Sequence, residues 1–165
     1  MGNWIMTVGG GGAALAAATL WRRWRAARKS ERQRLAIGDF LARRETVTDA
    51  FLPAAASLGK PRGLAWQSCD FHDAVEFALD RATGELYALA GVTIAFSAVE
   101  GGGMEDVEAV SNLRCATAVF VHRDGAWISE GRTVFNLEPA EAVLQFRETL
   151  ERLPSGAELA TAPPA

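Results

Sequence analysis

Two alternating stretches joined by a short turn constrain the fold of this chain most strongly. Residues 74–80 read AVEFALD, RATG follows as a turn, and LYALAGVTIAFSAV continues as a long strand. Closing the hairpin as a four-residue loop pairs Asp80 with Glu85, Leu79 with Leu86, Phe77 with Ala88 and Val75 with Ala90. Because all apolar members then share one face, while a one-residue slip mixes them with acids, the pattern predicts this register.

A second hairpin is predicted over residues 113–135. Asp124-Gly125 is the preferred pair for a two-residue type I′ turn. It places Arg123 opposite Ala126, His122 opposite Trp127, Val121 opposite Ile128 and Phe120 opposite Ser129. Two hairpins make a four-stranded antiparallel meander, and we expect a shorter strand around Ala65–Phe71 to add an edge.

Helices are predicted on both sides of the meander. Residues 22–45 are rich in helix formers. An apolar face follows from one helix that breaks around Thr46–Asp49 and stops near Pro53 or Gly59; its members are Leu35, Phe40, Leu41, Val47, Phe51 and Leu52. Pro139 opens a C-terminal helix whose apolar residues at helical spacing are Val143, Leu144, Phe146, Leu150 and Leu153.

These elements predict an α+β fold: an N-terminal transmembrane or stalk helix, then helices packed on a four- to five-stranded antiparallel meander with a C-terminal helix. The predicted division is a transmembrane helix at 1–21, a basic juxtamembrane helix at 22–45, a cytoplasmic α+β domain at 46–153 and a disordered tail at 154–165. At the level of fold only, the layout resembles cystatin-like or NTF2-like cones, which often hold a pocket. No motif in the chain carries that resemblance.

The N-terminal segment predicts a weak membrane span. No ionisable side chain occurs from Met1 to Trp21, and a helix of that length runs about 31 Å. Its hydrophobicity is low, because glycine and alanine dominate it. The arginines follow the apolar run, which is the reverse of a secretory signal peptide. A soluble or targeting segment is the remaining alternative.

The flanking residues predict the orientation of that span. We expect the membrane interfaces at Trp4, Trp21, Arg22, Arg23, Trp24 and Arg25, and anionic lipid headgroups along residues 22–34. The positive-inside rule then places the N-terminus outside and the domain in the cytoplasm, in an inner or plasma membrane. Small residues every fourth position, such as Gly10, Ala14 and Ala18, would allow a homodimer.

The charge is unevenly distributed. Residues 1–45 hold nine basic and three acidic side chains, and residues 46–165 hold eight and seventeen, which gives +6 and −9. A domain of net −9 lacks the basic footprint that nucleic acid needs, so we expect no nucleic-acid partner.

Candidate chemistry is sparse. Cys69 and His72, and Cys115 and His122, have opposite parity along a strand, so neither pair can hold a common metal ion. We find no catalytic motif, cofactor motif or metal site, and the side chains singled out are His122 and Trp127, as a pocket or a cross-strand pair.

The sequence therefore predicts a membrane-tethered domain that acts by protein–protein interaction or self-association, and enzyme activity has no positive indication. The alternative is a small-molecule pocket or an enzyme site between the sheet and its helices.

Overall fold

The computed structural model describes residues 9–58, 63–104, 106–107 and 112–154. The chain divides into two compact units, residues 1–35 and residues 36–165. Most of the long helix α1 (Gly9–Ala42) belongs to the first unit, and its last turns belong to the second.

The predicted membrane span covers the start of α1 and the residues before it. Within the described residues no helix combines the length and the apolar character that a membrane crossing requires. Residues 1–8 of the predicted span, including Trp4, lie outside the described residues.

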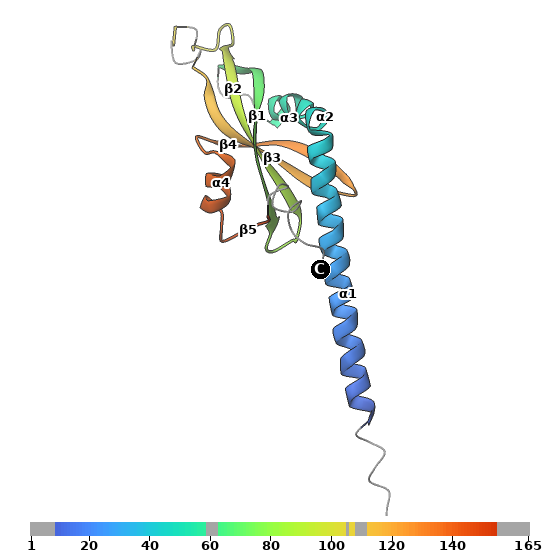
Figure 1. Cartoon of the computed structure of the whole chain (residues 1–165). Coiled ribbons are helices and arrows are strands. Elements are labelled where there is room, and N and C mark those ends of the chain that lie inside the picture. The colour runs from blue at the N-terminus through green and yellow to red at the C-terminus, as the bar shows by residue number, and fades with distance from the viewer. Residues whose placement is uncertain (1–8, 59–62, 105, 108–111, 155–165) are drawn as a thin grey trace, which may run out of the picture. The chain divides into compact units, whose positions relative to one another are not determined.

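The second unit is built on a curled antiparallel sheet (Figure 1). Its five strands are β1 (Leu64–Asp80), β2 (Leu86–Ala98), β3 (Arg114–Arg123), β4 (Ala126–Phe135) and β5 (Leu150–Arg152). They lie in the order β4-β3-β2-β1-β5. The predicted α+β class and the four-stranded meander are confirmed, and a fifth strand closes the β1 side.

Both predicted hairpin registers are confirmed. Leu79 faces Leu86 and Val75 faces Ala90 across the first hairpin. Across the second, all four predicted pairs are present, from Phe120 opposite Ser129 to Arg123 opposite Ala126. Asp124 and Gly125 both adopt positive φ, 51° and 80°, as a type I′ turn requires.

The strand expected at 65–71 is present, but it is not a separate edge strand. These residues form the first half of β1 and pair with β2, with register shifts between Trp66 and Ser68 and between Phe71 and Val75. The strand continues because the sequence between Phe71 and Val75 contains no turn residue pair, so the irregularity is absorbed as a bulge-like shift.

The expected C-terminal helix to residue 153 is also wrong. Helix α4 (Pro139–Gln145) ends after seven residues, a turn follows, and β5 pairs antiparallel with β1. The exposed edge of β1 supplies the backbone partners, and the Leu153 N–H extends this pairing by donating to the Phe77 carbonyl at 2.8 Å. Leu150 and Leu153 therefore pack against the core from the sheet and not from a helix.

Three helical segments cover the inner face of the sheet, defined by the even-numbered side chains of β2 and β3. The end of α1 is followed by α2 (Arg44–Asp49) and α3 (Phe51–Leu58). The break near Asp49 is close to its predicted place, but the segment is three helices. Of the predicted apolar face, Phe40 and Phe51 are fully buried, while Leu35 and Leu41 are exposed.

Helix α4 packs on the opposite, outer face, defined by the odd-numbered side chains of β2 and β3. Ala142 and Val143 contact Ala78 and Leu89 in a small second core. Its start combines Pro139 at a first-turn position with a capping box: the Glu138 side chain accepts from the N3 backbone, and the Glu138 N–H donates to Glu141. Local sequence thus fixes where α4 begins.

Candidate functional site

The alternative prediction from the sequence was a pocket between the sheet and its helices. The inner face of the sheet is instead filled by aromatic rings. Phe40 lies at 5.6 Å from Phe77 and from Phe120 and at 5.0 Å from Trp127, centroid to centroid. These edge-to-face contacts are typical of a packed core.

The two side chains singled out from the sequence belong to this packing. His122 and Trp127 face each other across β3 and β4 with ring centroids 5.2 Å apart. The Trp127 indole N–H donates to the Ala36 carbonyl at 2.9 Å, which joins the end of α1 to the sheet. Their geometry is that of a cross-strand pair with a structural role.

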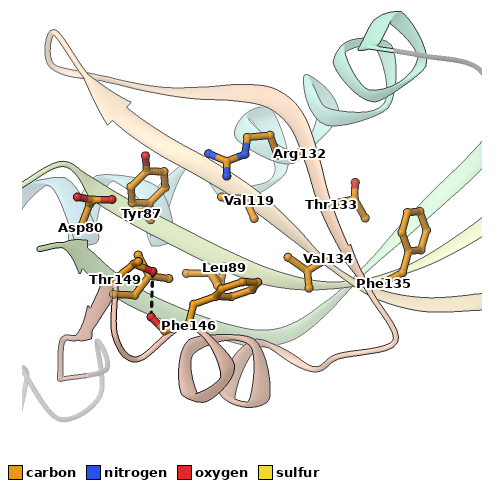
Figure 2. A pocket seen from close by; sticks show the side chains of 11 residues that line it. Asp80, Tyr87, Leu89, Val119, Arg132, Thr133, Val134, Phe135, Phe146 and Thr149 are labelled. Atoms are coloured by element: carbon orange, nitrogen blue, oxygen red, sulfur yellow. Dashed lines mark hydrogen bonds between the residues drawn. The ribbon is translucent and has the colours of Figure 1, made fainter. Parts of the chain in front are cut away.

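A groove lies on the outer face instead (Figure 2). It has a volume of about 490 Å³ and is open to solvent. Its lining residues come from all five strands and from the turn between α4 and β5: Asp80, Tyr87, Leu89, Val119, Arg132, Thr133, Val134, Phe135, Phe146, Thr149 and Leu150.

The length of α4 explains why the groove is open. Seven residues of helix run only about 10 Å, so α4 covers Ala78 and Leu89 but not the outer face of β3 and β4. Val119 and Val134 remain half-buried as the uncovered floor, and the Phe146 side chain forms a wall below it (Figure 2). The result is an apolar floor with one helix-side wall.

Polar groups gather toward one end of the groove. Figure 2 shows the Arg132 guanidinium directed toward the end where Tyr87 and Asp80 lie. Asp80 accepts backbone N–H bonds from Thr83 and Ala82 at 2.7 and 2.8 Å; the Thr83 bond is the main cause that lowers the pKa of Asp80. The Arg132 side chain is exposed and forms no hydrogen bond or ion pair with another described side chain.

The Tyr87 hydroxyl is held at the same end. It donates to Glu85 Oε2 at 3.1 Å, and burial, followed by this bond, raises the pKa of Tyr87. Glu85 is itself paired with Arg123, whose guanidinium also bonds Glu130. The polar end therefore carries fixed charges of both signs.

A second polar cluster surrounds Gly91 on the outer face. His72 Nε2 lies 2.7 Å from Thr93 Oγ1, and the Cys115 thiol donates to Glu138 Oε1 at 2.9 Å. A Cβ atom on Gly91 would lie 3.5 Å from both His72 Nδ1 and Glu138 Oε2, so the glycine leaves these side chains room.

The chemistry of this cluster does not favour nucleophilic catalysis. The bond to Glu138 is the main cause that raises the pKa of Cys115, which opposes the thiolate form. Cys69 lies on the inner side, where burial raises its pKa to about 11. Within the described residues, no three His, Cys, Asp or Glu side chains are placed to hold a metal ion.

Five of the predicted membrane-interface residues lie on α1, and the sixth, Trp4, lies outside the described residues. Trp21 and Trp24 are 54% and 52% exposed, and Arg22, Arg23 and Arg25 are exposed beside them. None of these five described residues is among those that line the groove.

No protein-family model, curated protein or solved structure matches this chain. The resemblance to cystatin-like or NTF2-like cones stays a prediction.

Sequence reasoning missed the groove, although a signal was present. Strand β2 reads LYALAGVTIAFSA, which is apolar at both parities, whereas a strand with one solvated face alternates. That pattern indicates that both faces of β2 are covered. The seven-residue length of α4, which leaves part of the outer face open, has no comparable signal.

Proposed function

We propose that this protein is a membrane-tethered binding domain that holds an apolar segment of a protein partner in the groove on the outer face of its sheet. The open, apolar-floored groove carries the proposal, because the inner face is occupied by packed rings. Its floor of Val119 and Val134 suits aliphatic or aromatic side chains.

The neighbouring strand supports an extended protein segment as the occupant. Within the described residues, β4 has a strand neighbour on one side only. A segment that pairs with the free side of β4 would direct alternate side chains over the groove, as in β-strand addition. Exposed apolar side chains continue this surface, with Ile128 at 41% and Phe146 at 42% exposure.

Peptide display on the full-length protein tests the groove. Selected peptides should lose affinity by about tenfold or more on Val134→Glu, because a carboxylate would enter the apolar floor. Val99→Glu is the matched control, since Val99 is an exposed valine outside the groove. If the selected peptides bind Val134→Glu and Val99→Glu equally well, the groove is not their binding site.

A second copy of the chain is the partner that can be tested directly. Sedimentation of the full-length protein in detergent should then show a concentration-dependent dimer that Val134→Glu dissociates and Val99→Glu leaves intact. A dimer indifferent to Val134→Glu would place self-association elsewhere.

A small amphipathic molecule is the second candidate occupant. A volume of about 490 Å³ lies within the range of ligand pockets, and Asp80, Tyr87 and Arg132 supply polar groups at one end. A fragment screen by thermal unfolding separates the candidates: a fragment that stabilises the parent protein but not Val134→Glu, with no peptide enriched, favours the small molecule.

The tether rests on the order of residues at the N-terminus. We place the uncharged segment 1–21 in an inner or plasma membrane as a single span, with the N-terminus outside and the domain in the cytoplasm. Full-length protein should resist alkaline extraction from membranes, and deletion of residues 1–21 should release it. If alkali extracts the full-length protein from membranes, the proposed membrane span is wrong.

A further inference from the structure

One face of α1 combines indoles with stacked guanidinium groups. Trp21, Arg25, Arg28 and Arg32 follow one another at spacings of four, three and four residues, which places them on the same side of the helix. The Arg25 guanidinium lies 4.3 Å from the Trp21 ring centroid, and that of Arg28 lies 4.1 Å from the Trp24 centroid. We call these five residues the tryptophan–arginine face.

The charge of this helix is not compensated within the described chain. Residues 22–35 contain seven basic side chains and one acid, Glu31. None of the seven cations forms an ion pair with another described residue, and both indoles are more than half exposed. A dense positive surface with exposed aromatic rings is complementary to an anionic surface that also admits indoles.

We propose that the tryptophan–arginine face lies against an anionic lipid surface, with the indoles among the headgroups and the guanidinium groups on lipid phosphates. A guanidinium group that lies over an indole ring still has N–H groups free to bind a phosphate. Each tryptophan–arginine pair can therefore place an indole among the headgroups and bind a lipid phosphate at the same time. This inference deepens the proposed tether and rests on it only for the membrane location, because every residue of the face except Trp21, the last residue of the predicted span, lies beyond that span.

Lipid fits this face better than nucleic acid does. Indoles accumulate at membrane interfaces, and basic side chains next to a span are attracted by anionic headgroups. Residues 46–165 carry a net charge of −9, which would repel a polyphosphate partner.

Two pairs of substitutions with equal charge provide a matched test. Arg25→Gln with Arg28→Gln removes two cations from the tryptophan–arginine face. Arg23→Gln with Arg34→Gln removes two from the opposite side of the same helix, which lies roughly half a turn away. All four side chains are exposed, so neither pair disturbs a core.

The readout is quenching of Trp21 and Trp24 by acrylamide in full-length protein reconstituted with vesicles. The contribution of these two indoles is the signal lost in Trp21→Phe with Trp24→Phe. We expect them to be shielded about tenfold more strongly in phosphatidylcholine–phosphatidylglycerol vesicles than in phosphatidylcholine alone, and salt should reverse the difference. The double variant Arg25→Gln with Arg28→Gln should abolish this difference in shielding between the two vesicle types. The double variant Arg23→Gln with Arg34→Gln should retain most of it.

The outcomes separate this inference from the tether. Equal shielding in both vesicle types, or equal effects of the two pairs, overturns the lipid face. Retention on neutral vesicles at high salt reports the span alone, whatever the shielding shows. Tighter binding to an oligonucleotide than to anionic vesicles, lost in the double variant Arg25→Gln with Arg28→Gln, would assign the face to nucleic acid and overturn the proposal.

Discussion

Arg152 forms a two-armed ion pair with Glu76, with Nε–Oε2 and Nη2–Oε1 distances of 2.8 and 2.9 Å. The pair joins the three-residue strand β5 to β1. Because Arg152 is more than half exposed, we expect Arg152→Ala to lower the free energy of unfolding by no more than about 1 kcal/mol. Urea titration measures this loss. Arg147→Ala is the control, because it makes the same charge change at an exposed arginine in the preceding turn, and it should lower the free energy of unfolding by less. An equal loss in the two variants would show that the ion pair does not stabilise the fold.

Gly131 allows α3 to approach β4 closely. Its φ is 72°, and a Cβ atom there would lie 2.5 Å from the Ala55 backbone nitrogen. Gly131→Ala should destabilise the protein by about 2–4 kcal/mol, because the helix must move in addition to the backbone strain. Gly103→Ala is the control, with the same φ of 72° and no atom within 4 Å of the added Cβ. Equal destabilisation by the two variants, measured in urea, would show that the contact with α3 contributes nothing.

Glu85 should contribute to the acid sensitivity of the fold. The hydrogen bond from Arg123 is the largest cause that lowers the pKa of Glu85 below its ordinary value of 4.5. A carboxyl whose pKa is lowered by folding stabilises the folded state above its unfolded pKa, and loses that contribution as the pH falls through the folded pKa.

The difference in unfolding free energy between the parent protein and Glu85→Gln should therefore be largest near pH 6 and shrink below about pH 4.5. Urea titrations across this range measure it. Glu148→Gln, at an exposed carboxyl without an ion pair among the described residues, serves as the control. A difference that stays constant down to acid pH would contradict the assignment.

Glu138 should suppress the reactivity of Cys115. Glu138→Gln replaces the carboxylate whose hydrogen bond, and to a smaller extent whose charge, raises the pKa of Cys115, so alkylation of this thiol by iodoacetamide at pH 8 should become faster. Cys69 is an internal control, because burial alone raises its pKa to about 11. Peptide mass spectrometry follows both sites in one sample. An unchanged Cys115 rate, or parallel changes at both thiols, would speak against the Glu138 contact.

The two hairpins were predictable because their information is local. Asp124-Gly125 adopts the turn that its residue types prefer, and the strict alternation around Phe77 permits only one register with a uniform apolar face. The start of α4 was equally local, since Pro139 and the Glu138–Glu141 capping box lie within one turn.

The errors arose where distant partners compete for the same residues. Leu150 and Leu153 fit a helical spacing, yet Leu150 pairs with Asp80 in the sheet, and the Leu153 N–H donates to the Phe77 carbonyl just beyond β5. The shifts within β1 likewise depend on its pairing with β2 and cannot be read from the segment alone.

The sequence by itself determined the registers of the two hairpins, the start of α4 and the separation of a basic helix from an acidic domain, because each follows from neighbouring residues or from composition. Tertiary structure decided which face is filled and which is open. Phe40 and Trp127 meet on the inner face from segments far apart in the chain, whereas the shortness of α4 leaves Val119 and Val134 uncovered on the other. Such relationships depend on how far each element extends once its partners are in place, and no local pattern encodes that.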